Sequence, residues 1–351
     1  MTTQQALLLT GHGSHHDALS AAPVYEHADR VRERGCFDAV RTAFWKEQPS
    51  LAEVRSTVEA ASVYIVPLLT SEGYFAERVF PRELGLAGDK LEGERDVYYT
   101  EPVGTHERLA DVIVNRVNTV TNEAANQADI GLVLVGHGTD RHERSADATV
   151  AHADRLRNRG TFASVESAFL DQTPNVDGVT ERVDTTDIVV VPLFVSNGHH
   201  VTRDIPAALG LPAVGDPFGG PTPVGEKRLW YAGAVGTAPS LTDVVIERAA
   251  EAGAETQPGR TSEAGPSEAE VAFLSWLEGG SQDGVDGSER TREWGELAIT
   301  VTEDCDDRRF DVRHESDRSA PVGDLDQLST SAEVRDKTGR DNAGNHRPLR
   351  T

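Results

Sequence analysis

Short runs of apolar, often β-branched residues alternate along this chain with segments of helical period. Such continuous apolar runs predict strands that are covered on both faces, as in a parallel sheet. Two longer segments, Ala22–Arg34 and Asp147–Arg159, carry acidic residues and Arg on one side and apolar residues on the other, which predicts amphipathic helices. The alternation predicts right-handed βαβ units. The apolar runs are 6–10, 62–69, 131–135 and 187–195, and a second, shorter helical pair covers 51–60 and 176–183.

The whole pattern occurs twice. The tripeptide Gly-His-Gly at 11–13 recurs at 136–138, and the same offset of 125 residues links Pro81 to Pro206 without a gap. A weaker match between 97–106 and 229–238 predicts a strand, a turn and a terminal helix at the end of each copy. A period this long indicates a duplicated domain and not a solenoid. We therefore expect an α/β fold of two duplicated lobes, 1–124 and 125–253, each a parallel sheet flanked by helices.

The composition changes after residue 255. Residues 256–267 are rich in Gly, Pro, Ser, Thr and Glu, which is typical of a linker. A short helix at 268–277 and strands at 295–302 and 309–314 are expected next, and the polar residues past 316 are expected to be disordered in part. The segment 254–351 is thus predicted to hold a linker and a small C-terminal α+β extension.

The charge balance is strongly acidic. The 351 residues include 58 Asp and Glu against 34 Lys and Arg, for a formal net charge of −24. Acidic residues spread along the whole chain are typical of a halophile, where molar salt reduces the Debye length to about 3 Å and so screens the repulsion between them. An acidic mesophilic protein is the alternative. Because no basic stripe is present, we expect no nucleic-acid partner.

Cysteine content and the length of the apolar runs exclude several further classes of protein. Cys36 and Cys305 are the only cysteines, too few for a disulfide framework, a CxxC zinc site or a four-thiolate cluster. The first residues carry no basic region followed by an apolar stretch, so no signal peptide is predicted. No apolar run reaches the roughly 20 residues of a membrane span. We expect a soluble cytoplasmic protein without a membrane partner.

Candidate chemistry lies at the strand ends, and the two copies differ there. Ligands of α/β sheets bind outside the carboxyl ends of the strands. His200, after the run 187–195, faces Phe75 in the first copy, and Asp171 faces Lys46. The second copy can therefore gather His137, Asp171 and His200, whereas the first has only His12 with Glu47 as a substitute acid.

Two imidazoles and one carboxylate suit a divalent first-row transition metal. They equally suit proton removal near neutral pH. A purely structural alternative has His200 capping the turn that follows it and His137 filling a loop.

These motifs resemble those of the CbiX/SirB-type class II chelatases, in the long two-lobed form. The resemblance is carried by Gly-His-Gly after the first strand, Phe169-Leu170-Asp171, and the segment from Pro192 to Pro206 with its His-Val and Asp-Ile-Pro. It covers about 250 residues and implies two chelatase-like lobes with a tetrapyrrole cleft between them. The family acid is usually Glu, so Asp171 is one methylene shorter. The His-rich tract and cluster cysteines of some long relatives are absent, and no iron–sulfur cluster is expected.

The resemblance implies a sirohydrochlorin cobaltochelatase of cobalamin biosynthesis, a lyase that inserts Co²⁺ into a tetrapyrrole. His137 and His200 would present the metal, Asp171 would complete its shell, and one imidazole, preferably His200, would take a pyrrole proton. The groups that could bind the anionic tetrapyrrole are Arg203, Arg141, Arg144, His199 and Asn197. The alternative is that these arginines lie on a solvated helix face.

Several alternatives remain open. One is a sirohydrochlorin ferrochelatase for sirohaem, since such ligands also accept iron and nickel. Another is a non-catalytic metal or tetrapyrrole carrier. A different α/β enzyme with a phosphate loop is disfavoured, because neither GxGxxG nor GxxxxGK[ST] follows a strand. No organic cofactor is expected, and a monomer is preferred because two lobes in one chain can replace a dimer.

Overall fold

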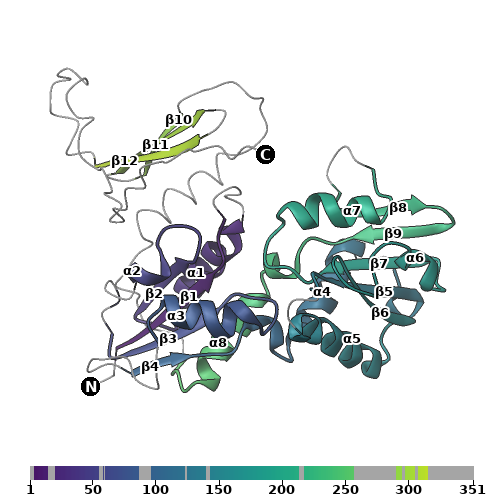
Figure 1. Ribbon diagram of the computed structural model, residues 1–351, viewed down its shortest axis with the longest axis horizontal. Helices are drawn as coiled ribbons and strands as arrows, with labels where there is room; N and C mark the ends of the chain where they lie inside the picture. Colours follow the sequence, from purple (N-terminus) through teal and green to yellow (C-terminus); the bar gives the residue numbers. More distant parts are fainter. Residues whose placement is uncertain are drawn as a thin grey trace, which may run out of the picture. The chain divides into compact units, whose positions relative to one another are not determined.

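The protein is described by a computed structural model that divides into two compact units, Met1–Asp283 and Gly284–Thr351 (Figure 1). Each unit is considered by itself. The described residues are 4–14, 20–54, 58, 60–86, 96–122, 125–139, 143–212, 217–256, 290–294, 297–304 and 307–314.

Two sheets form the first unit, one for each copy of the repeat. The first has the strand order β2-β1-β3-β4 and is parallel throughout; the second has the order β6-β5-β7-β9-β8 and is parallel except for β8. Every residue of β1 and β5 is buried, as expected for central strands covered on both faces. The strands are β1 Gln5–Gly11, β2 Ala39–Phe44, β3 Ser62–Pro67, β4 Asp96–Tyr99, β5 Ile130–Gly136, β6 Ser164–Phe169, β7 Asp187–Pro192, β8 Gly219–Val224 and β9 Lys227–Tyr231.

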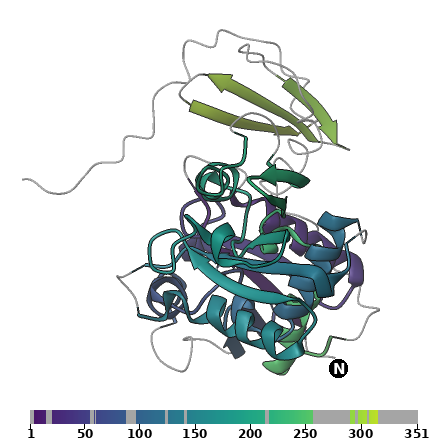
Figure 2. The ribbon, with the colours of Figure 1, turned by 90° about the vertical axis from the view of Figure 1, so that its right-hand side faces the viewer.

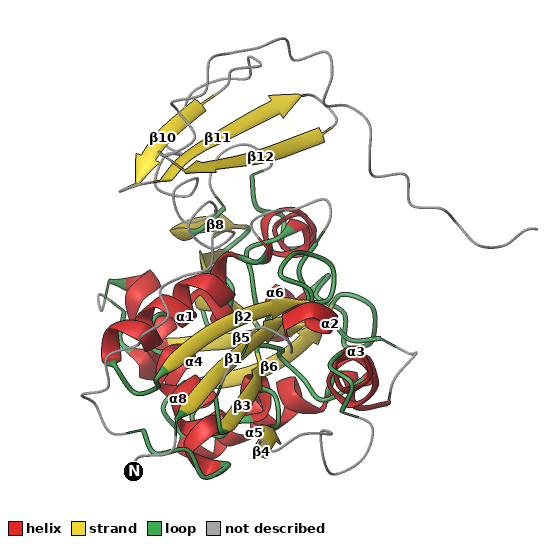
Figure 3. Ribbon diagram, turned by 90° about the vertical axis from the view of Figure 1, so that its left-hand side faces the viewer, coloured by secondary structure: helices red, strands yellow, loops and turns green. Residues whose placement is uncertain are grey.

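Helices cover both faces of these strands (Figure 3). The predicted two-lobed α/β architecture is confirmed, and the two long amphipathic helices begin and end as the sequence predicts. Both end at a glycine with left-handed backbone, which an L side chain adopts only at a cost. The helices are α1 Ala22–Arg34, α2 Leu51–Val54, α3 Phe80–Glu83, α4 Leu109–Thr121, α5 Asp147–Arg159, α6 Val179–Arg182, α7 Ile205–Ala208 and α8 Leu241–Glu251.

The terminal helices are exchanged between the lobes. Helix α4 follows the first sheet in the chain but packs against β7 and β9 of the second, whereas α8 packs against β3 and α1 of the first (Figure 1). One hydrophobic core therefore runs through both lobes, joining Leu9 and Val66 to Val245, and Leu134 and Val191 to Ile113. The outer faces of the two sheets have separate cores.

Two buried histidines fix this exchange reciprocally. His27 of α1 donates from Nε2 to the carbonyl of Gly236 at 2.8 Å, and His152 of α5 donates from Nε2 to the carbonyl of Gly104 at 2.8 Å. Each acceptor belongs to the other lobe. On the second ring nitrogen, Nδ1 of His27 accepts from the hydroxyl of Thr242, also at 2.8 Å. Both rings are at most 1% exposed.

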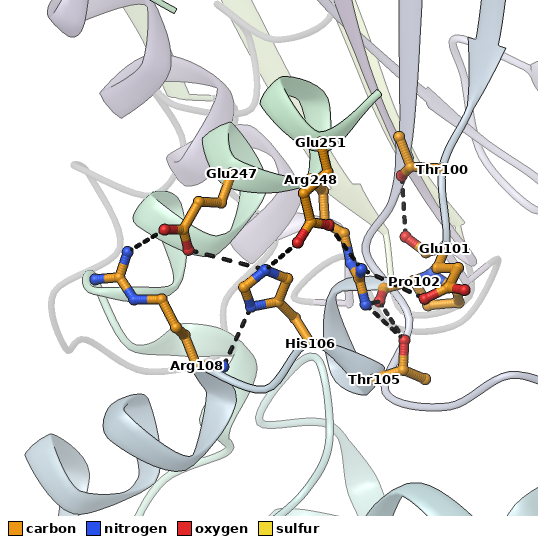
Figure 4. A network of polar contacts seen from close by, with 9 residues as sticks. All are labelled: Thr100, Glu101, Pro102, Thr105, His106, Arg108, Glu247, Arg248 and Glu251. Atoms are coloured by element: carbon orange, nitrogen blue, oxygen red, sulfur yellow. Dashed lines mark hydrogen bonds and ion pairs between the residues drawn. The ribbon is translucent and has the colours of Figure 1, made fainter. Parts of the chain in front are cut away.

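A polar network attaches α8 to the first lobe (Figure 4). The buried ring of His106 accepts the backbone N–H of Arg108 at Nδ1 and donates from Nε2 to Glu251, 3.1 Å away. The Arg248 guanidinium contacts the same carboxylate at 2.9 Å and the Thr105 hydroxyl at 2.8 Å. Directional contacts to charged groups thus hold the exchanged helix in one register.

The second unit contains an antiparallel sheet of β10 Arg290–Trp294, β11 Leu297–Asp304 and β12 Asp307–His314, in that order (Figure 2). Strands β11 and β12 correspond to the two that the sequence predicts, and β10 was not predicted. The helix expected at 268–277 and the polar segment past 316 lie outside the described residues. Within the described residues, no helix combines the length and apolar character needed to cross a membrane.

Candidate metal-presenting site

The Gly-His-Gly turn after β5 fixes His137 at the carboxyl edge of the second sheet. Gly136 has no room for a side chain, since a Cβ there would lie 2.4 Å from Oγ1 of Thr149 on α5. Gly138 has a φ of +67°, a conformation that favours glycine. The carbonyl of His137 accepts the backbone N–H groups of Leu170 and Asp171, both at 3.0 Å. The turn is therefore tied to the end of β6.

Glu47 stabilises the equivalent turn of the first lobe. Its Oε1 accepts the backbone N–H of Ser14 and the hydroxyl of Ser20. In the second lobe the amide oxygen of Gln172 accepts the N–H of Thr139 at 3.1 Å in the same way. Glu47 thus corresponds to Gln172 in position and in contacts, and it supports a loop.

His200 begins a π-helical turn, His200–Asp204, after β7. π-helical turns occur often at functional sites. The hydroxyl of Tyr231 donates to the carbonyl of Val201 at 2.6 Å, and burial raises the pKa of Tyr231 well above its ordinary value, so this donor keeps its proton. The buried phenol holds the turn against the end of β9.

The structure brings the two predicted imidazoles together. The ring centroids of His137 and His200 are 5.0 Å apart, and the rings stand at 88° to each other. Phe194, from the loop after β7, lies 6.2 Å and 6.0 Å from the two rings. Both histidine side chains are about half exposed, at 47% and 48%, so a solute can reach them.

Hydrogen bonds define the tautomer of each ring. Nδ1 of His137 lies 2.7 Å from the carbonyl oxygen of Gly138, and since a carbonyl only accepts, Nδ1 carries the proton. Nδ1 of His200 lies 2.6 Å from the Asp204 carboxylate and donates to it. Within the described part of the chain neither Nε2 has a hydrogen-bond partner, so each neutral ring presents a lone pair there.

The predicted third ligand is placed differently from the two rings. The carboxylate of Asp171 is 3.6 Å from Nδ1 of His137, on the protonated edge of that ring. Across the described ranges, no group of three or more His, Cys, Asp or Glu side chains is arranged to hold a metal ion. The arrangement supplies two nitrogen donors, and each ring has a carboxylate on its Nδ1 side.

The first lobe has aromatic side chains at the corresponding places. His12 keeps the same contact, with Nδ1 2.7 Å from the carbonyl of Gly13, but its ring packs edge-on against Trp45 at 5.0 Å and Phe75 at 4.8 Å. Partial loss of hydration against these rings lowers the pKa of His12, although the residue as a whole stays exposed. Lys46, at the place of Asp171, lies 3.8 Å above the Trp45 ring. The first lobe therefore keeps the turn and lacks the second imidazole.

The groups predicted to contact an anionic substrate have different environments. The side-chain oxygen of Asn197 accepts the backbone N–H of Ala234 at 2.7 Å, so it fixes the loop before the exchanged helix. His199 is 76% exposed, with Nε2 3.5 Å from Asp204. Arg203 is exposed and has no partner among the described residues.

Arg144 and Arg141 belong to the segment between His137 and α5. Arg144 pairs with Glu72 at 2.8 Å and with Glu77, both from the first lobe. Its charge is thus engaged in a contact between lobes. Arg141 lies outside the described residues.

Three further residues shape the site and were not predicted for it: Asp204, Phe194 and Tyr231. Asp204 and Phe194 stand in the segment that carries the family resemblance, but only the distance to Nδ1 shows that Asp204 sets the ring tautomer. Tyr231 stands in the weak third match between the copies, where Tyr99 donates to the Ala76 carbonyl at 2.8 Å in the same manner. A pairwise search for polar residues shared by both copies would have found the tyrosines.

Comparison with known proteins identifies the family of the chain. The family model described as CbiX matches residues 6–120 and 131–252, more than half of the chain, and the chain belongs to the CbiX family. A second model, described as the DR2241 stabilising domain, matches residues 285–351. A protein of Halobacterium salinarum named as a probable sirohydrochlorin cobaltochelatase is 48% identical over 269 residues, which cover 71% of this chain and 92% of that protein.

Solved structures support the same fold. DR2241 from Deinococcus radiodurans, described as a multi-domain protein similar to chelatases, has a TM-score of 0.62 at 29% identity. The match covers 86% of this chain and 65% of DR2241. SirB from Bacillus subtilis with Fe³⁺ has a TM-score of 0.57 over 72% of this chain and 96% of SirB; at 17% identity it supports the fold alone.

Proposed function

We propose that the protein is a sirohydrochlorin cobaltochelatase whose C-terminal lobe, 125–253, inserts Co²⁺ into the tetrapyrrole. The observation that carries the proposal is the pair of half-exposed imidazoles, His137 and His200, with ring centroids 5.0 Å apart and both Nε2 lone pairs available. The name of the haloarchaeal relative supports the same reaction. In this proposal the N-terminal lobe, 1–124, binds and positions without presenting metal.

Two nitrogen donors suit an ion that must be handed on. Imidazole nitrogen binds Co²⁺, Fe²⁺ and Ni²⁺, and a site with few protein ligands leaves positions open for the incoming ring nitrogens. The Asp204 carboxylate on Nδ1 of His200 orients the ring and fixes the tautomer that leaves Nε2 open to a metal ion. For His137 the Gly138 carbonyl takes this orienting role at 2.7 Å, and the Asp171 carboxylate lies nearby at 3.6 Å, beyond hydrogen-bond distance. The ion is thus held well enough to be presented and loosely enough to leave.

The same groups can accept the protons that insertion releases. The divalent ion replaces two pyrrole N–H protons of the macrocycle. When the ion leaves Nε2 of His200, the freed lone pair can take one of these protons, and the neighbouring Asp204 stabilises the imidazolium. His137, paired with Asp171, can take the other. Both protons then pass to solvent, to which the half-exposed rings have access.

Binding of the anionic tetrapyrrole needs local cations on an acidic protein. The exposed guanidinium of Arg203 lies one residue from Asp204 in the same π-helical turn, and five donors suit bidentate contacts to carboxylates. Arg141 and His199 are further candidates in this proposal. Asn197 is a weaker one, because its oxygen already accepts a backbone N–H.

The wider assignment follows from the reaction. We place the protein in cobalamin biosynthesis in the cytoplasm of a halophile, acting as a monomer on a metal substrate without an organic cofactor. The acidic composition, with a net charge of −24, supports the high-salt setting. Iron insertion for sirohaem remains the second candidate, because the two-imidazole set accepts either ion.

A turnover experiment tests the proposal against a passive carrier. Metal-free sirohydrochlorin and Co²⁺ are mixed with protein at about one hundredth of the tetrapyrrole concentration, and the absorbance of the metallated ring is followed. An enzyme converts all of the tetrapyrrole faster than the protein-free reaction. Conversion that stops at one equivalent of protein would show a carrier. Parallel reactions with Fe²⁺ and Ni²⁺ identify the preferred ion.

A matched variant tests the role of His200. His200→Phe introduces the residue that the first lobe has at the same place, Phe75, so the fold tolerates the side chain in that context. Insertion should fall to the protein-free rate while the circular dichroism spectrum and melting temperature stay near wild type. A variant that keeps the full rate would remove His200 from the mechanism.

A further inference from the structure

The metal-handling positions of the second lobe correspond to an aromatic cluster in the first. The cluster consists of His12, Trp45, Tyr74 and Phe75, from the carboxyl ends of β1, β2 and β3. Phe75 is the common neighbour, with ring centroids 4.8 Å from His12, 5.1 Å from Trp45 and 6.0 Å from Tyr74. Neighbouring rings at these distances stabilise one another and restrict side-chain motion.

Much of this cluster faces solvent and is not part of a closed core. Tyr74 is 55% exposed, more than any other large hydrophobic residue among those that the structure describes. His12 is exposed, and Trp45 and Phe75 are only partly buried. Exposed aromatic groups are costly to hydrate and commonly mark a surface that binds an apolar or flat ligand.

The cluster also adjoins the segment that begins with His137. Arg144 of that segment pairs with Glu72 and Glu77, which flank Tyr74 and Phe75 in the chain. The loop that carries the first metal-presenting imidazole and the turn that carries the aromatic side chains are therefore joined by ion pairs. These ion pairs link the turn that carries Tyr74 and Phe75 to the second lobe, which carries the two imidazoles.

A cation completes the surface. Lys46, one of four lysines in the chain, has its Nζ 3.8 Å above the Trp45 ring. It stands where the second lobe has Asp171, so the charge is reversed between the lobes. A flat conjugated ring with carboxylates at its rim needs an exposed aromatic ring to stack on and a cation nearby. The first lobe supplies an exposed ring in Tyr74 and a cation in Lys46, which lies over one face of Trp45.

We propose that the aromatic cluster and Lys46 bind one face and one peripheral carboxylate of the tetrapyrrole, while the second lobe presents the metal. The identity of this ligand rests on the proposed function. In this proposal the first lobe positions the macrocycle. The aromatic side chains and Lys46, which stand where the second lobe has metal-presenting residues, provide affinity for the tetrapyrrole. Its residues affect KM for the tetrapyrrole, whereas His137 and His200 affect kcat.

The test measures binding and turnover separately. Metal-free sirohydrochlorin is titrated into the full-length protein without metal, and Kd is read from the tetrapyrrole absorbance; insertion kinetics give KM and kcat. Trp45→Leu and Phe75→Leu should raise Kd and KM about tenfold, in line with a lost aromatic stack, with kcat within about twofold. Lys46→Gln should raise both constants about threefold, and Lys46→Arg should restore them. The Kd for Co²⁺ alone should stay unchanged in all four.

Substitutions at the partly buried Trp45 and Phe75 could unfold the lobe, so Tyr74→Ala is included as a variant at a mostly exposed position. It should raise the tetrapyrrole Kd about threefold with an unchanged melting temperature. Folded variants that bind sirohydrochlorin as the wild type does would overturn the inference even if the protein is a chelatase. Wild-type protein that binds the tetrapyrrole through these residues but never turns over would refute the proposed function and leave the inference standing.

Discussion

Mild acid should destabilise this protein through two histidines that the exchanged helices keep neutral. Burial lowers the pKa of His27 and of His152 from 6.5 to about 4. Each ring is at most 1% exposed and donates from Nε2 to a carbonyl of the other lobe. The two histidines are therefore protonated at a lower pH in the folded protein than in the unfolded chain.

The sign and size of the effect follow from linkage. Well above pH 6.5 neither state binds the proton, and the stability from these contacts is complete. As the pH falls through 6.5 toward 4, the unfolded state gains protons and the free energy of unfolding decreases. For a shift from 6.5 to about 4, the loss between pH 7 and pH 5 is about 2 kcal/mol for each histidine. The two together cost about 4 kcal/mol, a large part of a typical domain stability.

Urea denaturation of the full chain at pH 7, 6 and 5 measures this loss. His27→Gln keeps an uncharged N–H donor for Gly236 but cannot titrate, so its loss between pH 7 and pH 5 should be about 2 kcal/mol smaller than that of the wild type. His199→Gln, at a side chain that is 76% exposed, is the control and should keep the wild-type slope. Equal pH dependence in His27→Gln and wild type would refute the assignment of buried neutral rings.

Other consequences of the structure can be tested singly. Asp204→Asn should lower kcat for insertion by about tenfold to a hundredfold, because the carboxylate no longer orients Nε2 of His200; kcat equal to wild type would exclude this role. Gly236→Ala should give insoluble or strongly destabilised protein, since a Cβ there would lie 2.1 Å from the carbonyl oxygen of Val195; expression and melting temperature decide. Turnover should rise from low to molar KCl as repulsion between the acidic protein and the anionic tetrapyrrole is screened, and a steady fall would contradict this.

Local periodicity was sufficient to predict part of each lobe, but not the strands β2, β6 and β8. Apolar runs and 3.6-residue spacing identified β1, β3, β5 and β7 and the full extent of α1 and α5, because these signals reside in neighbouring residues. The exchange of α4 and α8 could not be predicted in this way. The pattern of an amphipathic helix shows that one of its faces is covered, but not by which sheet. The two homologous sheets offer nearly the same packing surface, so the sheet that each helix covers depends on contacts such as that of His27 with Gly236.

The site was predictable in position and less so in detail. Carboxyl ends of neighbouring parallel strands meet, so the approach of His137 and His200 followed from their places after β5 and β7. The direction of a short side chain such as Asp171 is not encoded by spacing, and it lies on the Nδ1 edge of His137. The hydrogen bond from Nδ1 of His200 to Asp204 could not be predicted either, because it depends on the π-helical turn that contains both residues.

In the proposed mechanism the two lobes have different roles, and the second lobe alone presents the metal. Insertion kinetics of His137→Ala and His12→Ala under identical conditions test it directly, because both histidines occupy the same Gly-His-Gly turn and bond to the equivalent carbonyl at 2.7 Å. His137→Ala should lose at least about a hundredfold in kcat, because losing a partner of a metal ligand already costs about tenfold to a hundredfold. His12→Ala should keep kcat within about twofold and change KM. A loss of kcat in His12→Ala as large as that in His137→Ala would contradict it.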